Sequence, residues 1–485
     1  MKESLMLALQ ALKDAGVHYG EVRYVNRERM WNGVKNQQVE TATHSVDTGV
    51  GFRVWHEGAW GCSATQNLSH DELVRTAKRA VEIAIAARKA GRPPVDWIPV
   101  SPQVGTYRTP LKKNPFEMDA GDRFGNLFSL TEQLTDHKEI ISAKAVAVAL
   151  KLESHLLTTE GADLQQEIYV TGGGMQATAG NALDVQTRSF PKDFEGNVRG
   201  GGWEVWESFR LDERAEQVRE EAVELLHAPV CPSGEYTIIL ANSQLSLHVH
   251  ETCGHPTELD RALGDEISLA GASFLTPDRR QDYQYGSELV NLTADATSQG
   301  GAGTFGWDDE GVSAGRTPLI EKGRFVNYLS NRESAARIGV PSSGASRANS
   351  WRSVPIVRMV NVNLEPGAGS LEDLIGDTKK GLLIETNKSW SIDDLRLNFQ
   401  FGCESALEIK NGQLGTRYKN PVYTGITPEF WGQCDAICGP EEWEMWGYLF
   451  CGKGDPMQSI HVGHGVAPAR FRNVQVGAKG EGGEG

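Results

Sequence analysis

"LSLHVHETCGHPTELD", residues 245–260, brings His250, Glu251 and His255 close together in the sequence. In the familiar zinc-protease pattern HExxH, the two histidines are four residues apart and share one face of a helix. Here they are five residues apart, so a regular helix would turn them about 140° away from each other. One metal ion could bind both imidazoles only if the helix ended, or were distorted, between them.

The residues around this stretch favour such a distortion. "EYTIILANSQ" predicts a buried strand and then a helix whose N-cap is Asn242 or Ser243. Gly254 lowers the cost of a distorted backbone, and Pro256 disfavours helical geometry at His255. We therefore expect the helix to end, or to carry a π-bulge, at about Gly254.

A catalytic zinc site needs a third protein ligand and one open position besides the two histidines. A thiolate would suit zinc well, and Glu251 would then be the general base that takes a proton from a zinc-bound water. Cys253 lies near the His250 face of the helix, but a chelate of Cys253 with His255 is geometrically awkward. The alternative is a helix end that carries ordinary surface histidines. The more distant candidates for the third ligand are Cys403, Cys434, Cys438, Cys451, His461 and His464.

The composition of the whole chain limits the possible functions. It has 485 residues, 39% of them hydrophobic and 23% charged, which is ordinary for a soluble protein of two or three domains. The formal net charge of −16 argues against a primary nucleic-acid binder, which needs a concentrated basic surface. Because there is no run of 18 apolar residues, we expect no membrane span. The seven scattered cysteines form no disulfide framework, which predicts a cytoplasmic protein.

Hydrophobic periodicity predicts an α+β fold in two parts. In the first part, "GVGFRVWHEGAWGCSA" predicts a strand hairpin, and residues 142–180 predict three strands, two of them separated by Gly172 to Gly174. The second part is mostly strands and glycine-rich loops. We predict a strand-and-helix domain over residues 1–229, a strand-rich domain with the candidate ligands over residues 230–476, and a flexible tail over residues 477–485.

A glycine-rich stretch in the second part also matches a known pattern. "GAGTFG", residues 301–306, has the form GxGxxG, but Asp308, Asp309 and Glu310 follow it instead of a helix. Three carboxylates would repel a pyrophosphate, so we do not expect dinucleotide binding. We expect these carboxylates to order a loop through backbone hydrogen bonds. A hard cation such as magnesium is the alternative.

"HETCGHPTELD" and, much later, "FCGKGDPMQSIHVGHGVAPARFRNVQVG" resemble the TldD/PmbA family of zinc metallopeptidases, specifically its metal-bearing TldD branch. "GVGFRVWHEGAWGCSAT", "GWDDEGVSAGRTPLIEKGRFVNYLSNRESAARIG" and "PIVRMVNVNLEPG" are similar to further stretches of the family, so the resemblance spans nearly the whole chain. By this resemblance, the zinc ligands are His250, His255 and Cys451, and the general base is Glu251. The PmbA branch lacks these ligands.

The resemblance implies a zinc-dependent peptidase that hydrolyses unfolded or short peptides by Glu251-assisted attack of a zinc-bound water. It also implies a dimer that encloses the site, either a homodimer or a heterodimer with a PmbA-type chain. An enclosed site is compatible with strand addition, in which backbone hydrogen bonds hold the peptide. The alternative is a non-catalytic scaffold or binding subunit of the same fold, with a structural zinc.

Two features depart from the family pattern. Residues 387–403 lack the Gly-Gly-rich segment that the resemblance leads us to expect, and this loop is expected to shape the substrate channel. Cys434 and Cys438 are also unexpected, and together with Cys403 they raise the possibility of a second metal site. Because a Cys-x3-Cys pair without a matching second pair is a weak signal, we favour buried thiols at these positions.

Overall fold

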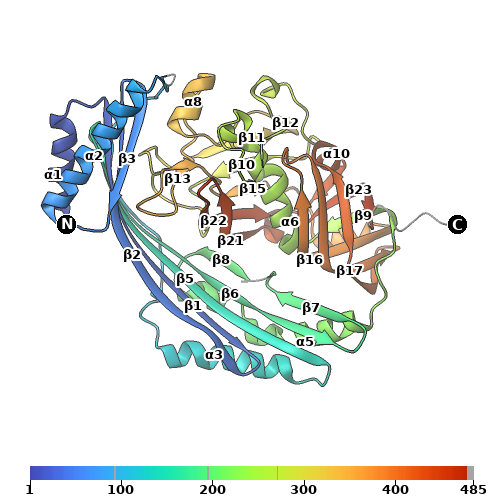
Figure 1. Ribbon diagram of the computed structural model, residues 1–485. Helices are drawn as coiled ribbons and strands as arrows, with labels where there is room; N and C mark the ends of the chain where they lie inside the picture. Colours follow the sequence, from blue (N-terminus) through green and yellow to red (C-terminus); the bar gives the residue numbers. More distant parts are fainter. Residues whose placement is uncertain (92–93, 194–195, 270, 478–485) are drawn as a thin grey trace.

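The structure is a computed structural model that describes residues 1–91, 94–193, 196–269 and 271–477 (Figure 1). The fold is α+β, and the strand-rich C-terminal part contains the HETCGH stretch. The predicted flexible tail, residues 477–485, lies outside the described residues except for Gly477. The predicted division between residues 229 and 230 falls in the connection between a helix and a strand, and it remains a prediction.

The N-terminal part is built on an eight-stranded sheet whose long strands curve together across the lower half of Figure 1. The strand order is β3-β2-β1-β5-β6-β4, and β7 and β8 also pair with β6. The long strands β1, β2, β5 and β6 are antiparallel neighbours. The strands are β1 (Tyr19–Lys35), β2 (Gln38–His56), β3 (Ala59–Thr65), β4 (Val104–Arg108), β5 (Ile140–Thr158), β6 (Asp163–Gly180), β7 (Val185–Phe190) and β8 (Asn197–Gly200).

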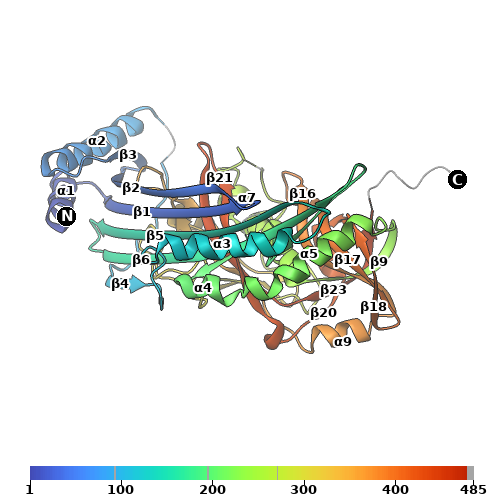
Figure 2. The same cartoon turned by 90° about the horizontal axis from the view of Figure 1, so that it is seen from below.

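The alternation of side chains along β1 explains how both faces of this sheet are covered. Val22 is buried against α1 and α2, and Met30 and Val34 are buried on the same face against α3 and α5. Trp31 points to the opposite face and contacts the core of the C-terminal part. Figure 2 shows α3 and α5 lying across the long strands. The helices of this part are α1 (Lys2–Asp14), α2 (His70–Lys89), α3 (Ala120–Thr135), α4 (Trp203–Ser208) and α5 (Leu211–His227).

The strand break predicted at Gly172 to Gly174 is wrong, because β6 continues through all three glycines. A Cβ atom at Gly172 would lie 2.0 Å from the carbonyl oxygen of Asn197 in β8. A Cβ atom at Gly173 would lie 2.1 Å from the carbonyl oxygen of Val146 in β5. These glycines therefore permit a close approach of neighbouring strands instead of ending the strand.

The C-terminal part contains a seven-stranded sheet of order β16-β9-β23-β19-β17-β18, with β20 paired to β23. Because β16 also pairs with β17, the strands β16, β9, β23, β19 and β17 form a closed ring. Helix α6 contacts β16 and the separate hairpin β21–β22. This sheet, helix α6 and the hairpin consist of α6 (Asn242–Val249), β9 (Gly234–Leu240), β16 (Lys380–Ile392), β17 (Asn398–Lys410), β18 (Gln413–Lys419), β19 (Val422–Ile426), β20 (Cys434–Ile437), β21 (Glu444–Lys453), β22 (Gln458–Val466) and β23 (Ala469–Val476).

Smaller elements complete the C-terminal part. Four short strands form a second sheet of order β12-β11-β10-β15, and β13 pairs with β14. Two short helices of this part, α8 and α9, each begin with a capping box. The elements are α7 (Leu259–Ala262), β10 (Leu292–Asp295), β11 (Arg316–Glu321), β12 (Arg324–Phe325), α8 (Arg332–Ile338), β13 (Ser346–Arg347), β14 (Ile356–Val357), β15 (Val362–Leu364), α9 (Leu371–Gly376) and α10 (Thr427–Gly432).

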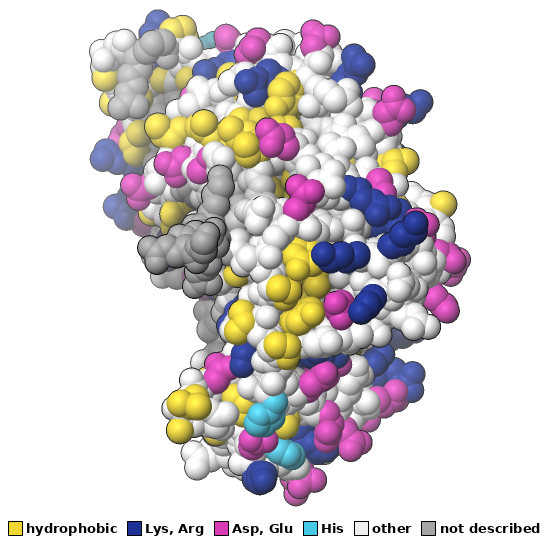
Figure 3. Space-filling model, turned by 90° about the vertical axis from the view of Figure 1, so that its right-hand side faces the viewer, with side chains coloured by type: hydrophobic (Ala, Val, Ile, Leu, Met, Phe, Trp, Pro, Cys, Tyr) yellow, Lys and Arg dark blue, Asp and Glu magenta, His cyan; other side chains and the backbone are white. Residues whose placement is uncertain are grey.

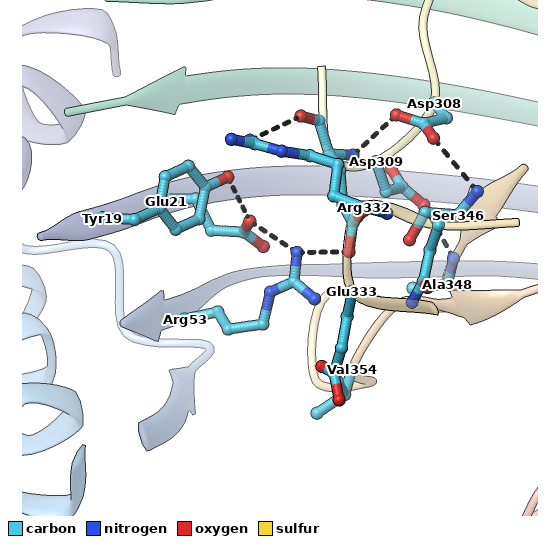
Figure 4. Close-up of polar contacts among 12 residues, drawn as sticks. Tyr19, Glu21, Arg53, Asp308, Asp309, Arg332, Glu333, Ser346, Ala348 and Val354 are labelled. Carbon is cyan, nitrogen blue, oxygen red and sulfur yellow. Dashed lines mark hydrogen bonds and ion pairs between the residues drawn. The ribbon is translucent and has the colours of Figure 1, made fainter. Parts of the chain in front are cut away.

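A buried ion-pair network joins the N-terminal sheet to the C-terminal part (Figure 4). Arg53 on β2 forms ion pairs of 3.0 Å with Glu21 on β1 and with Glu310 in a C-terminal loop. The Tyr19 hydroxyl donates to Glu21 at 2.7 Å, and the Arg332 backbone N–H donates to Glu310 at 2.9 Å. Since all these groups are buried, the carboxylate of Glu310 depends on Arg53 of the N-terminal sheet to balance its charge.

The carboxylates next to Glu310 bind backbone groups. Asp308 accepts hydrogen bonds from the backbone N–H groups of Glu310, Val312 and Ser346, at 2.9 to 3.1 Å. Asp309 accepts one from the backbone N–H of Ala348, at 2.7 Å. The expectation that this triplet orders a loop is therefore confirmed, and these contacts favour it over the magnesium alternative.

The surface carries charges of both signs. On the face shown in Figure 3, Lys and Arg side chains are interspersed with Asp and Glu side chains. Of the helices in the described part of the chain, none is long and apolar enough to cross a membrane.

Candidate metal centre

The HETCGH stretch begins where α6 ends. Regular α-helix stops at Val249, the residues His250–Gly254 form a π-helical turn, and His255–Thr257 form a short 3₁₀ turn. The wider π turn offsets the 140° that a regular helix would impose. The two imidazole ring centroids lie 4.8 Å apart with their planes at 89°. The predicted distortion between the two histidines is therefore confirmed.

The predicted N-cap of α6 is wrong. The helix begins at Asn242, and its N-cap is Ala241, which has no capping side chain. The Asn242 amide donates to the carbonyl oxygen of Glu442 at 3.0 Å, and the Ser243 hydroxyl accepts from the backbone N–H of Thr386 at 3.1 Å. These tertiary contacts use the polar side chains that local capping would have needed.

Cys451 on β21 completes a three-residue cluster with the two histidines. One potential ligand atom from each of His250, His255 and Cys451 lies within 4.8 Å of the others, and all three residues are buried. The Cys451 thiol lies 3.7 Å from Nε2 of His255. Cys253 is outside the cluster, and its sulfur accepts a hydrogen bond from the Tyr285 hydroxyl at 3.0 Å. The roles of the three clustered residues as zinc ligands remain a prediction.

A chain of hydrogen bonds orients the His250 ring. Nδ1 of His464 lies 3.0 Å from the carbonyl oxygen of Val362, so this nitrogen is the donor. Nε2 of His464 is then an acceptor, and Nδ1 of His250 donates to it at 2.8 Å. Nε2 of His250 is left without a proton, which is the form that binds a metal. His464 therefore orients a candidate ligand, a role that the sequence alone did not assign to it.

Glu258 orients His255 in the same way. Nδ1 of His255 lies 2.9 Å from the Glu258 carboxylate, which leaves Nε2 facing the thiol of Cys451. Arg261 and Lys453 lie 2.7 and 3.4 Å from the same carboxylate. Although burial alone would raise the pKa of Glu258, Lys453 and Arg261 hold it well below its usual value. Glu258 is therefore a charged acceptor for the His255 ring.

The electrostatics of the cluster suit a metal with soft or intermediate preferences. Burial lowers the pKa of His250 and of His255 to about 4, so both imidazoles are neutral near pH 7. Burial would raise the pKa of the Cys451 thiol, but His255 and Arg358 lower it below its ordinary value. Bonds of about 2.0–2.3 Å to tetrahedral zinc place ligand atoms about 3.3–3.8 Å apart. The 3.7 Å between the Cys451 thiol and Nε2 of His255 lies in this range, and the whole set lies within 4.8 Å. Two neutral imidazoles and an acidic thiol in such an arrangement fit zinc.

Glu251, the predicted general base, is buried beside the cluster and contacts an arginine. The Arg396 guanidinium forms an ion pair with Oε2 of Glu251 through Nη1. Arg396 lies in the atypical segment 387–403, and sequence reasoning did not single it out. The only sequence signal was that this segment departs from the family pattern, and nothing in the pattern specified an arginine opposite Glu251.

The remaining sequence candidates have other surroundings. His248 is fully buried against the aromatic side chains of Phe399 and Phe401 on β17, and burial lowers its pKa to about 3. Burial raises the pKa of the free thiols Cys434 and Cys438 to about 12, and that of Cys403 well above its ordinary value. Within the described ranges, no second group of three or more potential metal ligands is present.

A cavity of about 290 Å³ lies between the N-terminal sheet and hairpin β21–β22. Ile460 lines this cavity and pairs with Cys451 across the hairpin. Arg347 also lines it and donates to the carbonyl oxygen of Met359, whose sulfur abuts Gly254 of the π turn. The cavity therefore shares a wall with the metal centre. Its other lining residues include Arg27, Arg29, Trp31, Asn349, Phe450 and His461.

Known proteins are similar to this chain in sequence and in fold. The chain is 27% identical over 449 residues to "Metalloprotease MJ0996" of Methanocaldococcus jannaschii, with 92% of this chain and 94% of that protein covered. It is 21% identical over 501 residues to "Zinc metalloprotease TldD homolog" of Saccharolobus solfataricus, with 97% and 98% covered. The crystal structure of TldE from Thermococcus kodakarensis has the same fold, with a TM-score of 0.73, 17% identity, and 98% and 100% of the two chains covered.

Family profiles match both parts of the chain. The PmbA/TldA metallopeptidase C-terminal domain matches residues 233–478, which include the whole candidate centre. The PmbA/TldA metallopeptidase domain 1 matches residues 20–84, in the N-terminal sheet and α2. The C-terminal match alone covers half of the sequence, and so the chain belongs to the PmbA/TldD family of metallopeptidases.

Proposed function

We propose that this protein is a zinc-dependent peptidase that hydrolyses unfolded or short peptides. The observation that carries the proposal is the convergence of His250, His255 and Cys451 beside the carboxylate of Glu251. When bound there, zinc would supply Lewis-acid activation of a water molecule and of the peptide carbonyl. The names of the metalloprotease relatives support the same reaction class.

In the proposed reaction, Glu251 is the group that moves the proton. It takes a proton from the attacking water while the water oxygen forms a bond to the peptide carbonyl carbon. It then delivers that proton to the leaving amine when the C–N bond breaks. Both steps require a carboxylate whose position is fixed, and burial together with the contact to Arg396 supports this for Glu251.

The cavity beside the centre is the proposed binding region for part of the peptide. Trp31 and Phe450, whose stacked rings lie 5.8 Å apart, offer apolar contact area. Arg27, Arg29 and Arg347 line it, and the carboxylates of Asp308 and Asp309, which also line it, already accept backbone hydrogen bonds. Together these side chains support binding of a peptide segment with apolar and acidic or carboxyl-terminal groups.

We also propose that the protein acts as an oligomer, either with a second copy or with a TldE-type chain. The fold shared with TldE and the family resemblance support such an assembly. Light scattering of the purified chain measures its mass in solution. A mass equal to one 53.0 kDa chain at all concentrations would leave only the heterologous partner as an option.

The deciding experiment compares the zinc-loaded wild type with Glu251→Gln at equal zinc content. Glutamine keeps the volume of the side chain but cannot accept the proton, so peptide turnover should fall about 10²- to 10⁴-fold. Zinc content should change little, because Glu251 is not a predicted ligand. Thermal stability should fall, because the buried Arg396 loses its charged partner, so turnover is compared at a temperature where both proteins are folded. Equal turnover by both proteins would remove Glu251 from the reaction. Zinc binding without turnover by the wild type, alone or in a complex, would favour the non-catalytic scaffold with a structural zinc.

A further inference from the structure

The loop that carries Arg396 is held firmly against the metal centre. The Arg396 backbone N–H donates to the carbonyl oxygen of Asp393 at 2.9 Å, and its own carbonyl accepts from the Thr427 hydroxyl at 2.8 Å. The carbonyl of the preceding Leu395 accepts from the backbone N–H of Phe274 at 3.0 Å. Arg396 itself has a φ of +63°, a left-handed conformation that is uncommon for residues other than glycine.

This strained position puts a buried cation at the predicted general base. Arg396 is only 4% exposed, and within the described residues its one carboxylate partner is Glu251. Its Nε is buried without a hydrogen-bond partner among the described residues. A buried guanidinium with an unused donor is costly unless another anionic or polar group meets it at some stage. The backbone strain and the unused donor both indicate that Arg396 serves the site.

Other cations near the centre already have partners. Arg358 donates to the carbonyl oxygens of Cys451 and Gln458. Lys453 binds Asp260 at 2.7 Å and the carbonyl oxygen of Val357. The Nε of Arg358 is also buried without a partner among the described residues, but its terminal nitrogens bind main-chain carbonyls, whereas Arg396 is the cation that pairs with Glu251.

We propose that Arg396 is a catalytic residue that stabilises the negative charge on the substrate carbonyl oxygen during peptide hydrolysis. This inference rests on the proposed function and adds a residue to it. Before reaction, the guanidinium pairs with the Glu251 carboxylate. When Glu251 takes the proton of the attacking water it becomes neutral, and the electron pair of the carbonyl double bond moves to the carbonyl oxygen.

The negative charge thus passes from Glu251 to the carbonyl oxygen while the guanidinium stays positive. Arg396 can then direct its free Nε–H to this oxygen, and it loses little by leaving a neutral carboxylic acid. When the C–N bond breaks, the carbonyl re-forms, Glu251 gives its proton to the amine and the original ion pair returns. Such an interaction is stronger in the transition state than in the ground state, so it acts on kcat and not on KM.

The test uses Arg396→Gly and Arg396→Lys, with Leu395→Ala as the matched control on the same loop. Glycine adopts a positive φ without strain, so Arg396→Gly removes the side chain without distorting the backbone. Leu395 is 46% exposed, and its replacement should change nothing that is measured. At equal zinc content, Arg396→Gly should lower kcat about 10²- to 10³-fold and leave KM within about threefold.

Two further readouts separate catalysis from structure. The Kd of a peptide in which a phosphinate replaces the scissile amide, measured by calorimetry, should rise by about the same factor as kcat falls. Added guanidinium ion should restore part of the activity of Arg396→Gly, and Arg396→Lys should retain more activity than Arg396→Gly because it keeps the charge.

The results that would refute the role of Arg396 differ from those that would refute the peptidase function. A wild type that hydrolyses no peptide, alone or with a partner chain, refutes the function first. If the wild type is active, three results would refute the role of Arg396 alone. These are an unchanged kcat and phosphinate affinity in Arg396→Gly, a kcat that rises because Glu251 is released, and a loss of zinc that guanidinium does not reverse.

Discussion

His250 and His255 are five residues apart in the chain, yet their ring centroids lie 4.8 Å apart. A single π-helical turn, His250–Gly254, achieves this by widening the helix between them. The same turn leaves Glu251 beside the pair, where it meets Arg396. Local backbone geometry therefore converts an HExxxH spacing into an arrangement that one metal ion can use.

The π turn depends on the absence of a side chain at Gly254. Its φ of −68° suits any residue, but an added Cβ would lie 2.0 Å from the sulfur of Met359. Gly254→Ala should therefore lower the free energy of unfolding by about 1–3 kcal/mol and weaken zinc retention. The control is Gly432→Ala, at the end of α10, where nothing lies within 4 Å of the added carbon. Denaturant unfolding of both variants checks this, and equal effects would show that the close contact is unimportant.

Cys451 and Cys253 are both buried near the histidines, and we predict that only Cys451 is a zinc ligand. Cys451→Ser should strongly reduce the zinc retained after dialysis, because a hydroxyl is a much poorer zinc ligand than a thiolate. Cys253→Ser should retain zinc, since burial raises the pKa of this thiol to about 12 and its sulfur binds the Tyr285 hydroxyl instead. Elemental analysis of both proteins measures the effect. Full zinc in Cys451→Ser with loss in Cys253→Ser would reverse the ligand assignment.

Glu258 should affect zinc affinity without touching the metal. Glu258→Gln removes the negative charge that Nδ1 of His255 faces at 2.9 Å, so the ring becomes a weaker and less well oriented ligand. Loss of such an orienting partner typically costs about 10- to 100-fold in metal affinity. Competition with a zinc chelator near pH 7 gives the affinity. Glu372→Gln, an exposed position on α9, is the control, and an equal affinity in both variants would contradict the role of Glu258.

Glu310 should contribute to stability through the junction between the two parts. Glu310→Gln removes the charge that Arg53 contacts at 3.0 Å in a buried setting, and the free energy of unfolding should fall by about 3 kcal/mol. The exposed pair Arg79–Glu82 supplies the control, because Glu82→Gln should cost less than about 1 kcal/mol. Urea unfolding at equal zinc content measures both. Similar values would mean that the network does not hold the sheet to the C-terminal part.

Some of the site could be predicted from residues alone. Gly254 and Pro256 predicted the distorted turn, because glycine and proline change the backbone preferences at and next to their own positions. The alternation of Val50, Phe52 and Val54 likewise predicted a strand with one face against helices, and these residues are buried against α1 and α2. Cys451 as a ligand came only from the family resemblance, since no spacing rule links it to His255.

Other features depended on which distant segments meet. From the sequence, Gly172 to Gly174 predict the end of a strand. In the structure they lie within β6, because β5 and β8 approach there too closely for side chains. Asn242 and Ser243 suggest an N-cap but bind Glu442 and Thr386 instead.

By itself, the sequence determined the α+β class, the distorted turn between His250 and His255, and Glu251 as the candidate base. The family resemblance pointed to Cys451, and the tertiary structure places it and not Cys253 with the histidines. Only the tertiary structure decided that His464 and Glu258 orient the histidines and that Arg396 contacts Glu251. The reason is physical. Turn geometry depends on the backbone preferences of a few adjacent residues, whereas these contacts join residues on different elements, whose positions depend on strand register and packing of the whole chain.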